Sequence, residues 1–502
     1  MITKSSILVC IFCWLIFGSV FAQLVFDDNF DNGCLGVVSQ NGNIYTLEAT
    51  AFLHFRISGA MNQSPEFRVD QGSDYIFRND HRMIFRAEDD TAWHYFDNGY
   101  VTGPYYYFNH NTPFTSDTIY IAYWFPWTFG QMVDYMVQIA GHPFVRNDSV
   151  RGYSVQNRPI YGFEVTDPAM PDSLKEHVVI VARQHANESL GSHIIRGMSD
   201  YLIYSGDSAA TALRRKVVHH FYPMGNPDGV YLGEGYGGTP YLNLNRYWYP
   251  GTPSGGSTSP CIETDVLRQA IWDDADGSAT YCFDLHSHPG HIGQYYWWGL
   301  LSGPTPQMVE AAQELVQRIN FHDAADHGGI SLVAGQIVQD VWASPGPYAD
   351  YWFVETLGAV GYTLEPGSVP PQAFERIADV GIAFCKGLND VIEGPIMTKL
   401  KDEDGENALA ATTRLFQNYP NPFNNITNIR FHIADFAKKS SRFVSLKIYD
   451  IIGRQVATLV ADDLMPGNYK YTWDAEGLAS GVYFYRLETG DFSQTIKLLL
   501  LR

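Results

Sequence analysis

Three short segments, far apart in the chain, carry side chains that could together bind a metal ion. They are His185-Ala186-Asn187-Glu188, Asp284-Leu285-His286-Ser287 and Thr363-Leu364-Glu365. Two histidines and a carboxylate can provide three ligands to a tetrahedral zinc ion, which leaves the fourth position for water. A further carboxylate nearby provides the general base that metal-assisted hydrolysis needs. The residue types therefore predict a hydrolytic zinc site.

The expected secondary structure supports this prediction. His185 and Glu188 follow one apolar strand and lie three residues apart at the start of a helix, so both side chains can face one ion. His286 and Glu365 each end a further strand, and ligands of α/β sheets bind beyond the carboxyl ends of the strands. His288 shares a side of the chain with His286, and either could be the ligand. Each segment alone could be a helix start or a polar loop; their coincidence at strand ends favours a metal.

The elements that must position these residues lie between residues 151 and 395. Apolar strands are predicted at 178–182, 217–222, 281–285 and 360–364, and amphipathic helices at 189–204, 307–321 and 372–388. Strands that alternate with helices are typical of an α/β domain with a mixed or parallel sheet.

The flanking regions have a different pattern. Residues 23–150 form short aromatic and β-branched runs separated by turns, which predicts an antiparallel β-sandwich. Residues 396–413 are charged and turn-prone, as in a linker. Residues 414–502 contain about seven short strands, as expected for an immunoglobulin-like β-sandwich. We therefore expect a multi-domain chain with a central α/β domain between two β-rich domains.

The bulk composition is that of a folded protein. Of the 502 residues, 45% are hydrophobic and 17% are charged, which excludes a largely disordered chain. The net charge of −21 is spread along the sequence, and it argues against nucleic acid as a partner.

Residues 1–22 have the pattern of a secretory signal peptide, with a basic start at Lys4, an apolar stretch and a small-residue cleavage site ending at Ala22. No later apolar run reaches the ~20 residues that a membrane helix needs, so we expect an exported mature chain without a transmembrane segment. Four cysteines remain after cleavage. A bridge between Cys261 and Cys282 and buried free thiols are both compatible with the sequence.

Taken together, the motifs resemble the zinc metallocarboxypeptidases of the carboxypeptidase A-like family. The resemblance rests on the HxxE of His185 and Glu188, Asn-Pro-Asp-Gly at 226–229, Asn245-Arg246, the DLHSH segment at His286, and Glu365. The sequence is most similar to the cytosolic carboxypeptidase branch, whose zinc domain follows a β-sandwich that ends in a segment like Tyr-Trp-Phe-Pro-Trp-Thr-Phe at 123–129. The resemblance spans about residues 30 to 395 and implies a mixed sheet.

The resemblance also implies roles for individual residues. His185, Glu188 and His286 would hold one Zn2+ per chain, and Glu365 would deprotonate the zinc-activated water. The substrate-binding residues would be Asn245 and Arg246, which grip the terminal carboxylate, together with Ser287 and Tyr348, which line the pocket. Asn243 stands where many members have an Asp that orients a zinc-bound histidine, and its carbonyl could accept the same bond.

Two positions depart from the family pattern. The branch has an oxyanion-stabilising Arg where this chain has Tyr236, and the usual flap Tyr has no clear match around 341–344. Removing one oxyanion donor typically costs about 100- to 1,000-fold in rate. Arg183 or Tyr236 itself could compensate.

The end of the chain resembles the C-terminal sorting domains of the type IX secretion system. The carrying segments are Asn-Tyr-Pro-Asn-Pro-Phe-Asn at 418–424, Tyr-Asp-Ile-Ile-Gly-Arg at 449–454 and Leu-Ala-Ser-Gly-Val-Tyr-Phe-Tyr at 478–485. This resemblance implies that residues 414–502 engage the secretion machinery. The protein would then be secreted or held at the cell surface of a Gram-negative bacterium.

The sequence thus predicts a secreted zinc metallocarboxypeptidase that removes C-terminal residues from peptides. Tyr348 indicates a neutral side-chain preference, whereas Asp350 leaves a basic one open. Two alternatives remain: a carboxypeptidase or amidase acting on peptidoglycan stem peptides, and a non-catalytic surface protein that keeps the zinc fold for binding. Tyr236 favours the binding protein, whereas the presence of Glu365 favours an enzyme.

Overall fold

The computed structural model describes sixteen stretches of the chain. They are residues 24–48, 53–70, 81–234, 242–249, 261–287, 295–299, 306–326, 337–339, 348–366, 374–393, 413–415, 418, 423–433, 441–464, 467–490 and 492–501. The expected signal peptide lies outside these residues. Contacts divide the chain into two compact units, Met1–Asn389 and Asp390–Arg502.

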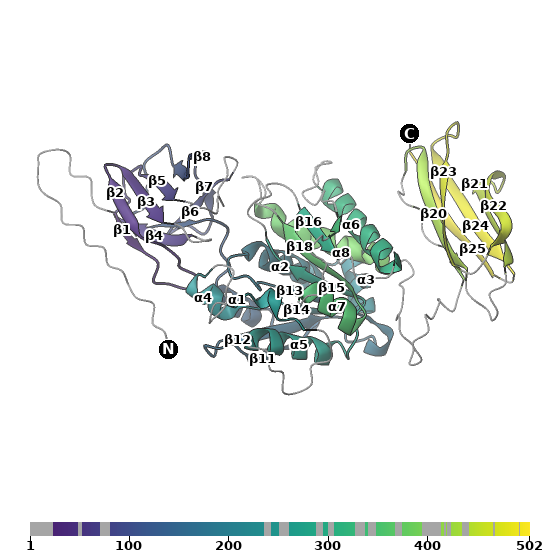
Figure 1. The fold of residues 1–502 in the computed structure, drawn as a ribbon. Coiled ribbons are helices and arrows are strands. Elements are labelled where there is room, and N and C mark those ends of the chain that lie inside the picture. Colours follow the sequence, from purple (N-terminus) through teal and green to yellow (C-terminus); the bar gives the residue numbers. More distant parts are fainter. Residues whose placement is uncertain are drawn as a thin grey trace, which may run out of the picture. The chain divides into compact units, whose positions relative to one another are not determined.

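The first part of the larger unit consists of two five-stranded sheets, in the orders β1-β4-β10-β6-β7 and β2-β3-β5-β9-β8 (Figure 1). Their buried side chains form one core rich in aromatic residues, including Phe55, Phe67 and Phe108. That residues 23–150 are a separate β-sandwich domain stays a prediction. The strands are β1 Val25–Asp27, β2 Val38–Asn41, β3 Ile44–Glu48, β4 His54–Ser58, β5 Glu66–Asp70, β6 Ile84–Ala87, β7 His94–Tyr95, β8 Asn98–Thr102, β9 Tyr105–Asn109 and β10 Ile119–Ala122.

The second part contains an eight-stranded sheet in the order β11-β12-β14-β13-β15-β18-β16-β17. Its centre is parallel, from β14 through β13 and β15 to β18, whereas β11, β12 and β16 pair antiparallel with a neighbour. The α/β domain with a mixed sheet is therefore confirmed. The strands are β11 Val145–Tyr153, β12 Pro159–Val165, β13 Glu176–Ala182, β14 Val217–Tyr222, β15 Tyr281–Leu285, β16 Tyr295–Gly299, β17 Ile337–Gln339 and β18 Val360–Pro366.

Helices cover both faces of this sheet (Figure 1). On one face, α5 and α7 bury apolar residues such as Leu267 and Trp352 against Val179 and Val181 of β13. On the other face, Phe283 of β15 packs edge-on against Phe384 of α8. The helices are α1 Phe129–Ile139, α2 Ser189–Tyr204, α3 Ser208–Lys216, α4 Pro227–Leu232, α5 Ile262–Asp274, α6 Pro306–Asp326, α7 Ala349–Leu357 and α8 Phe374–Glu393, with 3₁₀ turns η1 Asp172–Leu174 and η2 Leu244–Arg246.

The central elements follow the predicted pattern closely. The expected strands 217–222 and 281–285 and the expected helix 189–204 have the same bounds in the structure. The predicted helices 307–321 and 372–388 correspond to α6 and α8, whose ends differ by up to five residues.

Helices α2 and α8 cross at very short range because each carries a glycine at the crossing point. A Cβ atom on Gly197 of α2 would overlap the carbonyl oxygen of Ala378, and one on Gly381 of α8 would overlap that of Ile194. This close crossing positions α2, whose first turn follows two of the predicted zinc ligands.

A turn of the N-terminal part contacts the end of α4. Asn32 is fully buried and adopts a left-handed backbone with φ of 66°. Its backbone N–H donates to the carbonyl of Tyr231 at 3.0 Å, and its side-chain amide donates to that of Val230 at 2.8 Å. The two parts of the larger unit therefore meet through buried hydrogen bonds.

The smaller unit contains a three-stranded sheet, β19-β20-β23, and a four-stranded sheet, β22-β21-β24-β25. Side chains from both sheets share one core that includes Ile429, Leu446 and Tyr485. That this β-rich region is immunoglobulin-like stays a prediction. The strands are β19 Arg414–Leu415, β20 Ile426–Ile433, β21 Arg442–Asp450, β22 Gln455–Leu464, β23 Gly467–Asp474, β24 Gly481–Thr489 and β25 Phe492–Leu500.

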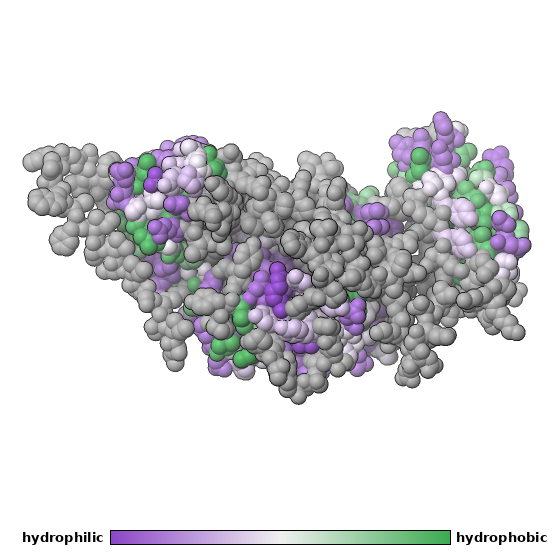
Figure 2. All heavy atoms as spheres, in the orientation of Figure 1, coloured by the Kyte–Doolittle hydropathy of each residue, from purple (hydrophilic) through white to green (hydrophobic). Residues whose placement is uncertain are grey.

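Cys34, Cys261, Cys282 and Cys385 are free thiols, so the structure contains no Cys261–Cys282 bridge. None of the helices in the described ranges is long and apolar enough to cross a membrane. On the face drawn in Figure 2, hydrophilic and hydrophobic residues are interspersed over the coloured surface, and single exposed apolar residues mark no binding site.

We expect Gly197→Ala to lower the free energy of unfolding of the larger unit by about 1–3 kcal/mol, because the new methyl group has no space at the α2–α8 crossing. Gly206→Ala is the matched control, since a Cβ there meets nothing within 4 Å. Urea denaturation followed by circular dichroism measures both. Equal stability of the two variants would contradict the steric argument.

Candidate metal centre

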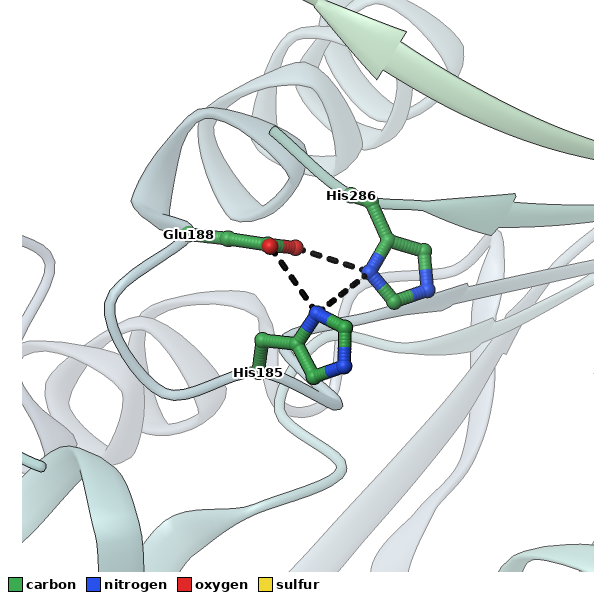
Figure 3. Close-up of side chains that lie close together, drawn as sticks. All are labelled: His185, Glu188 and His286. Carbon is green, nitrogen blue, oxygen red and sulfur yellow. Dashed lines mark hydrogen bonds and ion pairs between the residues drawn. The ribbon is translucent and has the colours of Figure 1, made fainter. Parts of the chain in front are cut away.

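The sheet brings the predicted zinc ligands together at the carboxyl ends of two neighbouring parallel strands. β13 and β15 pair in register from Val178 with Tyr281 to Ala182 with Leu285, so the two strands end side by side. His185 lies in the loop after β13, Glu188 is the N-cap of α2, and His286 directly follows β15. Figure 3 shows the three side chains pointing toward one another.

The three side chains form a small triangle. His286 Nδ1 lies 2.7 Å from Glu188 Oε2 and 3.1 Å from His185 Nδ1, and His185 Nδ1 lies 2.9 Å from Glu188 Oε1. All three residues are buried. The lone pairs of the two Nδ1 atoms would repel each other at 3.1 Å, so a proton or a metal ion must lie between them.

The far side of each imidazole is held by an oxygen acceptor. His185 Nε2 lies 3.0 Å from Asn243 Oδ1, and His286 Nε2 lies 2.7 Å from Asp284 Oδ2. Each acceptor favours a proton on Nε2 and therefore leaves the Nδ1 lone pair for the shared centre. The bond predicted for Asn243 is confirmed.

A chain of buried hydrogen bonds orients Asp284 in turn. The Trp248 indole N–H donates to Gln184 Oε1 at 2.6 Å, and Gln184 Nε2 donates to Asp284 Oδ2 at 2.6 Å. An indole can only donate, which fixes the orientation of the Gln184 amide and makes its NH2 group face the carboxylate. The position of His286 is thus set by residues outside the ligand cluster.

The electrostatics of the cluster favour a cation at its centre. Burial opposes a negative charge on Glu188, but the neighbouring His185 and His286 stabilise that charge and lower the pKa of the carboxyl to about 2. Burial likewise opposes charge on His286, but Asp284 and Glu188 raise its pKa well above the usual value. Without a metal ion, a proton on His286 offsets one of the two negative charges of Asp284 and Glu188.

These residues fit zinc. The donors are two imidazole nitrogens and one carboxylate, which is a common ligand set for zinc sites with an open position. Ligand atoms on a tetrahedral zinc with bonds of about 2.0–2.1 Å lie roughly 3.3 Å apart, and the distances of 2.7, 2.9 and 3.1 Å are slightly shorter. A small outward movement of the side chains would accommodate the ion.

The predicted substrate-binding residues lie next to the cluster. Asn245 Nδ2 is 3.3 Å from His286 Nε2, and its Oδ1 accepts from the N–H of Ala349 at 2.9 Å, at the start of α7. The exposed guanidinium of Arg246 lies 4.7 Å above the ring of Tyr348. The buried Ser287 donates its backbone N–H to Glu188 Oε2 at 3.1 Å.

Other predicted residues are described only in part. Glu365 belongs to β18, one residue beyond Leu364, which pairs with Leu285 and accepts from His286 N–H at 2.8 Å. The side chain of Glu365 lies outside the described part of the chain, as do His288 and Tyr236.

Sequence reasoning did not predict the bond between Asp284 and His286, nor the roles of Gln184 and Trp248. The Asp-x-His spacing places Asp284 on the same side of the strand as His286 and is a usable signal for their bond. Gln184 and Trp248 have no such signal, because they contact Asp284 and each other only after the sheet has formed.

A second group of potential ligands lies where Glu164 of β12 and His220 of β14 approach Asp274 at the end of α5. Here arginines already neutralise the carboxylates: Arg146 Nε is 2.6 Å from Glu164 Oε2, and Arg151 Nε is 3.0 Å from Asp274 Oδ2. We interpret this group as a buried ion-pair network and not as a metal site.

Two solved structures share their fold with about three quarters of this chain. A metallo-carboxypeptidase from Burkholderia cenocepacia aligns with a TM-score of 0.62 at 20% identity and covers 74% of this chain and 99% of its own. A metallo-carboxypeptidase from Pseudomonas aeruginosa aligns with a TM-score of 0.61 at 17% identity, over 73% and 99%. The fold is therefore that of the metallo-carboxypeptidases over about three quarters of this chain.

Sequence comparisons match two parts of the chain to known families. Residues 88–291 match the zinc carboxypeptidase family (Peptidase_M14), and residues 417–501 match the secretion system C-terminal sorting domain. Cytosolic carboxypeptidase 6 of Caenorhabditis elegans is 30% identical over 34% of this chain and 37% of its own length, and the human protein is 29% identical over 34% of each. The chain thus spans about a third of the length of these relatives.

The chain accordingly contains a zinc carboxypeptidase domain related to the cytosolic carboxypeptidases, and it carries a type IX sorting domain at its C-terminal end. Both predicted resemblances are confirmed. The family match ends at residue 291, before Glu365, so the role of that residue rests on the proposal below.

We expect Asp284→Asn to weaken zinc binding by about 10- to 100-fold, because the neutral amide no longer stabilises the Nε2–H form of His286. Competition with a chromogenic chelator measures the affinity. Asp273→Asn, on the exposed side of α5, is the control and should bind zinc like the wild type. An unchanged affinity of Asp284→Asn would contradict the orienting role of this carboxylate.

Proposed function

We propose that this protein is a secreted zinc metallocarboxypeptidase that hydrolyses C-terminal residues from peptides. The carrying observation is the buried triangle of His185, Glu188 and His286, in which both Nδ1 atoms face the carboxylate and both Nε2 atoms have oxygen acceptors. A buried ion pair with a purely structural role does not require two imidazoles that both direct their Nδ1 atoms at one centre. The match to the zinc carboxypeptidase family supports the same conclusion.

In this proposal, different residues of the chain bind the metal and transfer the proton. His185, Glu188 and His286 hold one zinc ion, which when bound activates water and polarises the scissile carbonyl. Glu365 takes a proton from the attacking water and passes it to the leaving amine. Its backbone position beside His286, on the neighbouring strand, supports this role.

The substrate's terminal carboxylate is assigned to Asn245 and Arg246. An exposed guanidinium beside an amide suits a carboxylate, since Arg can donate two parallel hydrogen bonds. Stacking on Tyr348 limits the orientations of Arg246, and Ser287 lies against the ligand Glu188. These contacts support a carboxylate site next to the proposed zinc site.

The central test compares wild-type protein with Glu365→Gln, both loaded with stoichiometric zinc, on a peptide library read by mass spectrometry. We expect C-terminal trimming by the wild type and a loss of at least about 100-fold in kcat for the variant, because the general base is removed. Equal zinc content of the two proteins is the control.

No trimming by zinc-loaded wild type would overturn the peptidase proposal. A parallel reaction with muropeptides distinguishes the peptidoglycan alternative, since release of D-amino acids there, without action on ordinary peptides, identifies a stem-peptide hydrolase. Inactivity on both substrates with tight zinc binding identifies a binding protein.

We further propose the organisation and location of the chain. Residues 1–22 act as a signal peptide, 23–150 form a β-sandwich, 151–395 the zinc domain, 396–413 a linker and 414–502 an immunoglobulin-like sorting domain. Together with the sorting-domain match, this organisation supports export to the surface or surroundings of a Gram-negative bacterium.

Deletion of residues 414–502 should retain the protein in the periplasm, because the sorting signal is lost. Immunoblots of periplasm, cell surface and medium, in a host with type IX machinery, measure this distribution. The truncated protein should still bind zinc, because the described ligands belong to the other compact unit. Normal export of the truncated chain would contradict the sorting role.

A further inference from the structure

Arg183 occupies an unusual position between the end of β13 and the loop that carries His185 and Glu188. Its side chain is fully buried, with 0% exposure, and its backbone is left-handed with φ of 60°. This conformation is unfavourable for a residue with a Cβ atom and persists only where the surroundings enforce it. A buried cation in a strained conformation therefore stands two residues before a proposed zinc ligand.

The contacts of Arg183 connect three separate segments. Its Nε donates to the carbonyl of Ala186 at 2.9 Å, within the ligand loop itself. Its Nη1 donates to the carbonyl of Trp127 at 3.1 Å, in the segment that follows β10. Its own carbonyl accepts from the N–H of Asn226 at 3.0 Å, at the turn before α4.

The guanidinium bonds to backbone carbonyls where an ion pair would be the usual arrangement. Within the described ranges, no carboxylate lies in salt-bridge contact with Arg183, and its Nη2 is buried without a hydrogen-bond partner. Burial of an incompletely compensated charge is costly. The planar fork of arginine can hold two carbonyls in a fixed relation, which a lysine ammonium cannot do.

We propose that Arg183 is a positioning residue that holds the His185–Glu188 loop in its zinc-binding geometry and ties that loop to Trp127. This inference rests on the proposed zinc function. Ala186 lies between the two ligands of the loop, so a shift of its carbonyl moves both ligands. The role predicted from the family pattern, compensation for the oxyanion donor, does not agree with a guanidinium that is buried on two carbonyls.

A purely structural role would have a different consequence, and Arg214 provides the matched comparison. It is also buried, and its Nη1 donates to the carbonyls of Leu202 and Ser205 at 2.7 and 3.0 Å. These contacts tie the end of α2 to α3 and involve no proposed ligand. Loss of either arginine should lower stability, but only loss of Arg183 should change zinc binding.

The experiment measures the zinc dissociation constant of the full chain by competition with a chromogenic chelator, alongside urea denaturation of the metal-free proteins. The variants are Arg183→Met, Arg183→Lys and Arg214→Met. We expect both Arg183 variants to bind zinc about 10- to 100-fold more weakly, as when other residues that orient metal ligands are changed. Arg214→Met should remain within about twofold of wild type because its site is separate.

Wild-type affinity in Arg183→Lys, or in Arg183→Met with the same stability loss as Arg214→Met, would overturn the positioning role. Arg183→Lys keeps the charge and provides a second folded variant if Arg183→Met does not fold. Absence of zinc binding by the wild type would instead overturn the proposed function. The two failures are therefore distinguishable.

Discussion

The buried carboxylate of Glu188, held between the Nδ1 atoms of His185 and His286, is the interaction on which the centre of this protein depends. With Asp284 behind His286, the site contains two buried carboxylates that require compensating positive charge. Buried charge without compensation is too costly to persist. A proton on His286 can provide one positive charge, and a zinc ion provides two without disturbing the Nε2 hydrogen bonds. The same set of contacts therefore explains both the stability of the cluster and its suitability for a metal.

The sheet explains why the cluster can form. Parallel pairing of β13 with β15 and of β15 with β18 brings three carboxyl ends to one edge, so that residues about 100 positions apart become neighbours. The glycine crossing then sets how closely α8 packs against α2, the helix that Glu188 precedes. Packing on the far side of the sheet, around Trp352 and Trp248, supports the hydrogen-bond chain that ends at Asp284.

The N-terminal β-rich part is connected to this centre and is more than an adjacent module. Asn32 bonds to the end of α4, and the carbonyl of Trp127 accepts from Arg183 next to the ligand loop. The segment 123–129, whose sequence resembles that of the cytosolic carboxypeptidases, thus has a physical connection to the proposed zinc site. The C-terminal unit has its own core, as expected for a sorting domain that is recognised independently of the enzyme.

The sequence by itself determined the local and the chemical parts of this description. Apolar periodicity located β14, β15 and α2 to the residue, and side-chain types predicted His185, Glu188 and His286 as ligands, three residues that the structure brings together. Both predictions depend on near neighbours and on side-chain chemistry. The family resemblance assigned Asn243 to a histidine, and its Oδ1 lies 3.0 Å from His185 Nε2. Residue types alone left open the choice between His286 and His288, which the family resemblance made in favour of His286, and the choice between a Cys261–Cys282 bridge and buried thiols.

Only the tertiary structure decided the long-range contacts. Gln184 and Trp248 are ordinary residues until the fold places them behind Asp284, and Arg183 looks like a surface cation until its guanidinium is buried on the carbonyls of Ala186 and Trp127. Such contacts carry no periodicity and no fixed spacing along the chain. They arise from the register of paired strands and the packing of helices, which depend on the whole sheet and not on any one segment.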